Sequence, residues 1–160
     1  MPQRVFGQSG GAGAVADNSV WASVAIGPST ASAGSFRNEG QLFGADLSVW
    51  LTRNKLALGI RTASASRVFD PGDVYDFAAL VGIHPRTEPG GDVVAGLGVG
   101  SSRGHDTGGG NLRTTPVIAA GAQVTFNYRF VGIGLDAFGG FGHDRCYYGA
   151  GLALAFGRFR

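Results

Sequence analysis

Residues 41–67 alternate apolar side chains with small or polar ones so regularly that they constrain the fold of the whole chain. Successive side chains of a β-strand point to opposite faces, so this alternation predicts two strands. The polar break at residues 53–55 predicts a short turn between them, which makes the segment a β-hairpin with one wholly apolar face. That face consists of Phe43, Ala45, Leu47, Val49, Leu51, Leu56, Leu58 and Ile60.

The opposite face of this hairpin carries two charges of opposite sign, Asp46 and Arg61. If residues 53–54 form the turn, Asp46 lies directly opposite Arg61, and we expect a cross-strand ion pair. Leu51 then lies opposite Leu56. A soluble barrel usually keeps apolar side chains inside and charges outside. An ion pair on the face of small residues indicates the reverse, a sheet whose apolar face meets lipid.

Glycine accounts for 29 of the 160 residues, whereas an average chain has about 7%. It follows no three-residue collagen period, and it is unfavourable in helices. We therefore predict an all-β protein: a single eight-stranded antiparallel up-and-down β-barrel, with its apolar face outward in a membrane. The predicted strands lie at residues 19–27, in the two halves of 41–67, and at 75–84, 92–102, 115–127, 130–140 and 147–159.

The connections between these strands are predicted to alternate in length, as they do when all the long loops lie at one end of a transmembrane barrel. Residues 1–18 are rich in Gly, Ala and Ser without a period, so we expect a flexible N-terminal arm and a barrel domain over 19–160. The longer loops are predicted at 28–40, 69–74, 103–113 and 141–145, and the short turns at 53–54, 85–91 and 128–129.

The charge pattern argues against several classes of function. The formal net charge is only +2 and the arginines are scattered, so nucleic-acid binding is not expected.

The single cysteine, Cys146, excludes an intrachain disulfide and offers no metal cluster, and we expect neither a cofactor nor a metal. No apolar run approaches the ~18 residues of a transmembrane helix, but a barrel strand needs only ~9–11.

Which face forms the interior decides between two readings of the barrel. With the apolar face outward, small residues line a narrow lumen that Trp21, Trp50, Leu80 and Phe138 fill, with Gly on neighbouring strands making room. With the apolar face inward, the chain would be a soluble lipocalin-like barrel that binds a small apolar ligand. Its outside would then be a Gly/Ala surface with few charges, which is poorly suited to water, so the outward arrangement is favoured.

Two sets of side chains are the candidate sites of the outward arrangement. The polar residues of the lumen form the first set, in which Asp136 is expected opposite Gly121; the aromatic residues toward the strand ends form the second, a girdle at each membrane interface. Tyr148 and Phe156 lie about 26 Å apart along one strand at ~3.3 Å per residue. The lumen set is Asp46, Arg61, Gln123 and Asp136, and the girdle set is Phe43, Tyr75, Phe126, Phe130, Tyr148 and Phe156.

The alternating strands, the loop-length rhythm and the aromatic-containing last strand resemble the small eight-stranded outer-membrane β-barrels of Gram-negative bacteria, of the OmpX/OmpA-barrel type. The resemblance spans residues 19–160. It implies a bacterial outer-membrane location, with membrane lipid and the barrel-assembly machinery as partners and a surface ligand for the long loops. The family typically ends in a lipid-facing aromatic residue, whereas here Phe159 is penultimate and in the inward register. No signal peptide is visible, so we expect the given start to be a trimmed form.

The favoured function is therefore a non-enzymatic outer-membrane barrel, too narrow to be a porin, that acts through its external loops or as a structural membrane protein. A second alternative is a membrane-embedded lipid-modifying enzyme, a hydrolase or acyltransferase of lipid A or phospholipid, because some barrels of this kind carry His, Ser and an acid near one rim. Nothing in the spacing pairs a nucleophile with a base. The loop residues concerned are Ser101, Ser102, His105, Asp106, His143 and Asp144.

Overall fold

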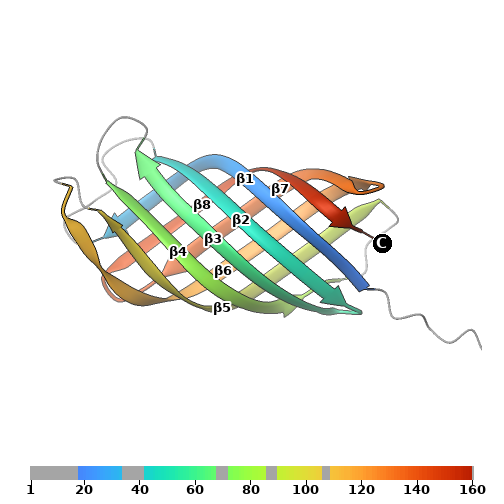
Figure 1. Ribbon diagram of the computed structural model, residues 1–160, viewed down its shortest axis with the longest axis horizontal. Helices are drawn as coiled ribbons and strands as arrows, with labels where there is room; N and C mark the ends of the chain where they lie inside the picture. Colours follow the sequence, from blue (N-terminus) through green and yellow to red (C-terminus); the bar gives the residue numbers. More distant parts are fainter. Residues whose placement is uncertain (1–17, 34–41, 68–71, 86–89, 106–108, 160) are drawn as a thin grey trace, which may run out of the picture.

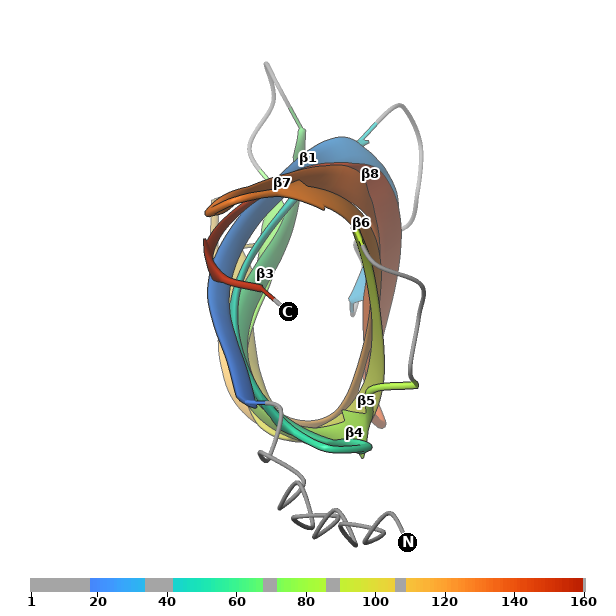
Figure 2. The ribbon, with the colours of Figure 1, turned by 90° about the vertical axis from the view of Figure 1, so that its right-hand side faces the viewer.

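The computed structural model describes residues 18–33, 42–67, 72–85, 90–105 and 109–159. These residues form eight antiparallel strands, each paired with the next along the chain, and the last strand pairs with the first to close the barrel (Figures 1 and 2). The predicted eight-stranded up-and-down barrel is confirmed. The strands are β1 (Asn18–Ala33), β2 (Leu42–Arg53), β3 (Leu56–Arg67), β4 (Asp73–Ile83), β5 (Gly91–His105), β6 (Asn111–Tyr128), β7 (Val131–Phe141) and β8 (Arg145–Arg158).

The two ends of the barrel differ in their connections. One end, called here the terminal end, carries the start of β1, the end of β8 and the connections 54–55, 84–90 and 129–130. The other, called the loop end, carries the connections 34–41, 68–72, 106–110 and 142–144. The arm predicted over residues 1–18 lies outside the described residues except for Asn18, which begins β1. No helix in the described part of the chain is long and apolar enough to cross a membrane.

Several strands continue further toward the loop end than the alternation predicted. β1 runs to Ala33, through the first part of the predicted loop 28–40, and β6 begins at Asn111. Beyond the apolar segments the outward side chains become polar, as at Ser64 and Arg103, while the backbone pairing continues. The apolar alternation ends where the outer surface becomes polar, although the strand itself continues. The predicted loops were therefore too long, and the predicted difference in length between loops and turns was too large.

The registers of two hairpins differ from the prediction by the same amount. The turn residues are 54–55 and 129–130, and the first of each has a positive φ, 55° at Asn54 and 58° at Arg129. Asn is one of the few residues that adopt this left-handed conformation readily, which favours Asn54 as the first residue of its turn. Moving a turn by one residue moves each cross-strand partner by two positions and therefore leaves every side chain on its predicted face.

Three predicted cross-strand pairs are wrong as a result. Asp46 lies opposite Ala63, and Arg61 lies opposite Ser48. The remaining corrections concern Leu51, which lies opposite Leu58 and not Leu56, and Asp136, which lies opposite Gln123 and not Gly121.

The apolar face of the sheet is on the outside of the barrel. Leu47, Val49, Leu58, Leu135 and Leu154 are all exposed, and Leu135 is 63% exposed in the middle of β7. The inward positions hold mainly small, polar or aromatic residues with a few aliphatic ones such as Leu80, and Trp50 is only 2% exposed. This polarity contradicts the lipocalin-like alternative, which requires the apolar face to line the interior.

The lumen is filled by large side chains placed beside glycines. Trp50 lies opposite Gly59, where a Cβ would come within 2.7 Å of the indole ring. Phe138 lies opposite Gly149, where a Cβ would come within 2.6 Å of the phenyl ring. Each bulky ring therefore occupies the space that a neighbouring side chain would need. This arrangement explains part of the high glycine content and was expected from the sequence.

Candidate functional site: the filled lumen and the two barrel ends

Arg61 is the centre of the polar interior. It projects inward from β3 with only 2% of its surface exposed. Its Nη2 donates to Asp76 Oδ2 on the adjacent strand at 3.0 Å, and further to the hydroxyl of Tyr147 at 3.4 Å. The guanidinium also donates to the backbone carbonyls of Ala120 and Gly139 on the far wall. Arg61 thus ties β3 to β4, β6, β7 and β8.

Asp76, and not Asp46, is the ion-pair partner of Arg61. Its second oxygen, Oδ1, accepts from the backbone N–H of Ala63 at 3.0 Å, so both carboxylate oxygens have donors. Asp46 instead shares a hydrogen bond with Ser48 on its own strand and lies within electrostatic range of Arg61. A buried carboxylate with two donors and a cation is well satisfied, whereas loss of the cation would leave its charge uncompensated.

Gln123 links a second part of the interior. Its Oε1 accepts from the indole N–H of Trp21 at 2.7 Å, and its Nε2 donates to Ser23 at 2.8 Å and Asp136 at 3.2 Å. Ser23 continues the chain to Ser48 at 2.8 Å. Asp46, Arg61, Gln123 and Asp136 therefore all lie inside the barrel. Gln123 bonds to Asp136 and, through Ser23 and Ser48, is linked to Asp46, whereas Arg61 bonds to Asp76.

The terminal end of the lumen is closed by a third cluster. His84 Nε2 lies 2.6 Å from Asp92 Oδ1, and Asn127 donates to Asp92 Oδ2 at 2.6 Å. The ring of Phe159 is buried, with its centroid 5.9 Å from that of Trp21, so its predicted inward register is confirmed. Figure 2 shows the C-terminal end of the chain lying over the opening of the ring at this end.

The loop end brings the histidines of the enzyme alternative close to acids but not to a serine. The backbone N–H and ring Nδ1 of His105 both lie 2.8 Å from Asp73 Oδ1. Ser102 is buried without a hydrogen-bond partner among the described residues, and Ser101 faces outward. Asp106 lies outside the described residues. No Ser–His–acid arrangement is assembled in the described part of this rim.

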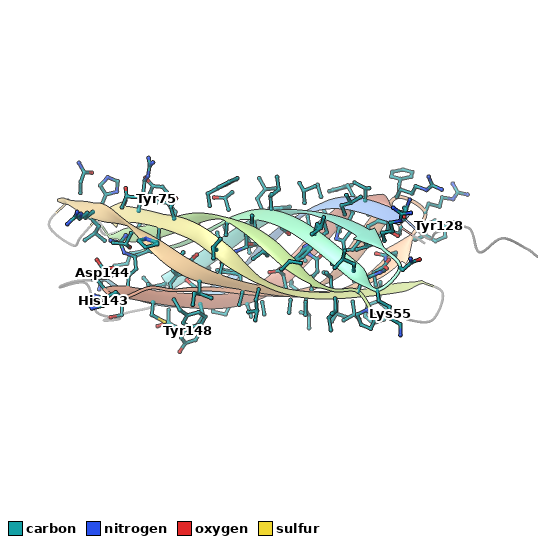
Figure 3. The ribbon with its side chains drawn as sticks, turned by 90° about the horizontal axis from the view of Figure 1, so that it is seen from below. Lys55, Tyr75, Tyr128, His143, Asp144 and Tyr148 are labelled. Atoms are coloured by element: carbon teal, nitrogen blue, oxygen red, sulfur yellow. The ribbon has the colours of Figure 1, made fainter. Side chains whose placement is uncertain are left out.

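Arg145 is the other buried cation of the loop end. It bonds to Asp144 at 3.4 Å through Nε and donates to the carbonyl of Arg113. Slight burial works to raise the pKa of the Asp144 carboxyl, but the hydrogen bonds and positive charge of Arg145 outweigh it and hold that pKa below its ordinary value. His143 and Asp144 themselves are exposed at this end (Figure 3). The described residues contain no group of three or more potential metal ligands.

The predicted girdle residues all lie on the outer surface, in two groups. Tyr75 and Tyr148 lie toward the loop end and Tyr128, which was not in the predicted set, toward the terminal end (Figure 3). Because the strands of such barrels tilt by about 40°, the ~26 Å between Tyr148 and Phe156 along β8 corresponds to only ~20 Å along the barrel axis. The exposed predicted residues are Phe43, Tyr75 and Tyr148 near the loop end, and Phe126, Phe130 and Phe156 near the terminal end.

Sequence reasoning missed four of the residues that organise the interior. Asp76 falls at an inward position between Tyr75 and Phe77, so the same alternation that placed Arg61 inside also places Asp76 there. Tyr147 begins the inward register of β8 in the same way. The alternation also places His84 and Asp92 at inward positions, but their pairing carried no such signal, because it forms across the connection between β4 and β5.

A closed up-and-down barrel with an apolar outer wall and a polar, filled interior has the architecture of the transmembrane β-barrels. No protein-family model matches this sequence, and neither does any curated protein. Solved structures do match. The crystal structure of Ail, the attachment invasion locus protein of Yersinia pestis, in complex with the heparin analogue sucrose octasulfate, is similar with a TM-score of 0.59 and 18% identity, over 89% of this chain and 99% of that chain.

Two further crystal structures show the same likeness. Neisserial surface protein A matches with a TM-score of 0.68 and 15% identity, over 89% of this chain and 97% of that chain. The N-terminal β-barrel domain of Pseudomonas aeruginosa OprF matches with a TM-score of 0.57 and 13% identity, over 88% of this chain and 96% of that one. At these identities the likeness concerns the fold: the chain has the fold of the small eight-stranded outer-membrane β-barrels, as its sequence predicted.

Proposed function

We propose that this protein is a non-enzymatic β-barrel of the bacterial outer membrane, closed to solutes, that acts through its loop end or as a structural membrane component. The observation that supports it most is the outer wall of exposed Leu, Ile, Val and Phe side chains. Covering that wall with lipid removes a surface that water solvates poorly. The girdle residues at the strand ends would then stand at the two membrane interfaces, where aromatic side chains are favoured.

The filled lumen supports the second part of the proposal. Trp21, Trp50 and Tyr147 are almost fully buried between the strands, and Arg61 spans the interior to the opposite wall. An eight-stranded barrel leaves little more than the space such side chains occupy. The lumen polar network of Asp46, Arg61, Gln123 and Asp136 is thus proposed to be a structural plug and not a conduction path.

The loop end is the proposed site of any surface recognition. Strands β1, β5 and β6 project polar residues there beyond the apolar wall, and four connections gather at this end. Ail and Neisserial surface protein A, which share this fold, are named as an attachment protein and a surface protein. We propose by analogy a ligand presented outside the cell, with membrane lipid and the barrel-assembly machinery as the other partners.

The membrane proposal is tested by expressing the chain behind an export signal and fractionating the cells. The protein is expected in the outer-membrane fraction, extracted only by detergent, and its gel migration is expected to change on heating. A folded monomer that remains in solution without detergent would contradict the proposal.

The absence of conduction is tested in planar lipid bilayers. The purified barrel is expected to give no steady single-channel current, and a wild-type trace with long-lived regular openings would contradict a filled lumen. Trp50→Ala serves as the matched variant, because it removes the largest side chain beside Gly59 and leaves the outer wall unchanged.

A further inference from the structure

Four exposed basic side chains stand around the terminal end, and we call them the basic collar: Arg53, Lys55, Arg129 and Arg158. Arg53 ends β2 and Arg158 ends β8, while Lys55 and Arg129 lie in the two turns. Among the described residues none of the four forms an ion pair. Arg129 lies over the ring of Tyr128, 5.4 Å from its centroid.

No exposed acidic side chain offsets these charges in the described part of the terminal end. Asp92 is buried there and bound by His84 and Asn127. In the sequence, the connection 84–90 adds one Arg and one Glu, which cancel. The collar therefore carries four positive charges that no acidic side chain of the described residues offsets, and the Arg129 charge stacks on the Tyr128 ring.

The loop end has a different balance of charge. Its buried cation, Arg145, is paired with Asp144, and His105 contacts Asp73. The loop sequences 34–41, 68–72 and 106–110 contain three acidic residues against one Arg. The arginines of this end, Arg103 included, are matched in number by acidic residues of its loops and strand ends in the sequence, so the uncompensated positive charge is a property of the terminal end.

The position of the collar along the barrel axis, relative to the apolar wall, matches that of lipid head groups. Arg53 follows Leu51 on the outward face of β2, and Arg158 follows Phe156 on that of β8. One such step of two residues is about 6.6 Å along a strand, or ~5 Å along the axis of a barrel whose strands tilt by about 40°. The charges thus begin just beyond the apolar wall, and their long aliphatic stems allow the heads to reach the interface.

Two members of the collar form one patch across β1. Arg53 lies opposite Asn18, and Arg158 lies opposite Val20 on the other side of the same strand. Two strand spacings and an offset of two residues along β1 separate their backbones by about 12 Å. Lys55 lies close to Arg53 along the chain, and Figure 3 shows it at the same end of the barrel as Tyr128. A patch of this width fits adjacent lipid phosphates.

We propose that the basic collar binds the phosphate groups of anionic phospholipids in the leaflet that surrounds the terminal end, and so sets the depth and orientation of the barrel. This inference rests on the proposed membrane function. A soluble acidic partner is less well matched, because Arg53 and Arg158 project from the outer wall, where lipid lies, and not from the open rim. A juxtamembrane Lys or Arg favours an anionic lipid surface by about fivefold.

The test measures lipid selectivity separately at each end. Tyr128→Trp places a fluorescent reporter beside the collar, and Tyr148→Trp places a matched reporter near the loop end; Trp21 and Trp50 are shielded in the lumen. Each variant is reconstituted with phosphatidylglycerol or phosphatidylcholine carrying brominated chains, which quench a Trp that they touch. The ratio of the two association constants is expected to be about fivefold at Tyr128→Trp in low salt.

At Tyr148→Trp the ratio is expected to stay near one. At Tyr128→Trp it is expected to fall toward one in 1 M NaCl, where charges are screened beyond ~3 Å. It should also fall in a variant that adds Arg53→Gln, Lys55→Gln, Arg129→Gln and Arg158→Gln. No preference for phosphatidylglycerol at Tyr128→Trp in low salt would overturn the proposal, as would a preference that survives the four substitutions.

The salt dependence needs no collar variant, so the proposal stays testable if the fourfold variant does not fold. Failure of the membrane proposal gives a different result. If the barrel is not in lipid, neither reporter is quenched by either brominated lipid. Quenching at both reporters without a head-group preference rejects the collar alone.

Discussion

Arg61→Met is the substitution that most sharply tests the polar interior. Met keeps a long apolar stem of similar reach but removes the guanidinium, and with it the bonds to Asp76, Tyr147 and the two far-wall carbonyls. Asp76 keeps two neutral donors, the backbone N–H of Ala63 and the hydroxyl of Tyr147, but loses its only cationic partner among the described residues. Breaking a buried ion pair by removing one partner typically costs about 3–5 kcal/mol. A typical domain has only about 5–15 kcal/mol of stability, so a large part should be lost.

The assay is equilibrium urea unfolding in lipid vesicles, followed by Trp fluorescence and by heat-modifiable gel migration. A double-mutant cycle then separates the pair from its surroundings. In Arg61→Met/Asp76→Leu neither charge remains, so we expect the double variant to be more stable than Arg61→Met alone. Arg103→Met, at an exposed position, is the matched control and should change the free energy of unfolding by less than ~0.5 kcal/mol.

The reasoning would be refuted if the free energy of unfolding of Arg61→Met lay within about 1 kcal/mol of the wild-type value, because a loss of that size is expected for an exposed ion pair. It would also be refuted if the loss of unfolding free energy in the double variant equalled the sum of the losses in the two single variants. Either result would mean that the folded barrel does not depend on the Arg61–Asp76 pair.

Three other substitutions and one titration test neighbouring parts of the structure. Gly59→Val should cost about 1–3 kcal/mol, because its Cβ would lie 2.7 Å from the Trp50 ring, whereas Ala122→Val on the exposed outer face of the barrel should be nearly neutral in urea unfolding. Leu135→Lys should cost about 2–4 kcal/mol in a bilayer and Tyr128→Lys at most ~1 kcal/mol, since the penalty depends on depth; equal costs would argue against a membrane band. Phe159→Ala should cost about 3 kcal/mol by removing the buried ring beside Trp21, and an unchanged urea midpoint would show that this ring does not close the lumen. The Asp144 carboxylate attracts Arg145 fully above its unfolded pKa and loses that attraction as the pH falls through its lowered folded pKa, so NMR titration of Arg145→Met should show that pKa raised, and no change would remove Arg145 as its cause.

The face of each strand residue could be predicted from the sequence because it depends only on parity along the strand. Leu58 and Arg61 are three residues apart on one strand, so they lie on opposite faces of the sheet whatever the position of the turn. The partner of each residue depends on the turn itself, and a shift of one residue at Asn54 was enough to replace the expected Asp46–Arg61 pair by Arg61–Asp76. Local patterns therefore predicted which side chains are inside, but not which ones bond.

The strand ends and the contacts between distant strands were harder to predict from the sequence. The apolar alternation of the outward side chains indicates where lipid would cover the wall, whereas β1 continues past that region to Ala33 through backbone pairing and the inward packing of Ala31. The bonds from Arg61 to Ala120 and Gly139 connect strands that never pair with β3, so they depend on the diameter and stagger of the closed barrel. Nothing in a local pattern carries that information.

The central claim, that the apolar face meets lipid and the small-residue face does not, is tested most directly along β8. Spin labels would be attached one at a time to cysteines at positions 150–156 in a Cys146→Ser background, with the barrel in phospholipid bilayers. Collisions with oxygen, which concentrates in lipid, are predicted to be frequent at Ala150, Leu152 and Leu154 and rare at Ala153 and Ala155. The account would be contradicted if oxygen collided most often with labels at Ala153 and Ala155. It would also be contradicted if a polar nickel reagent collided most often with labels at Leu152 and Leu154.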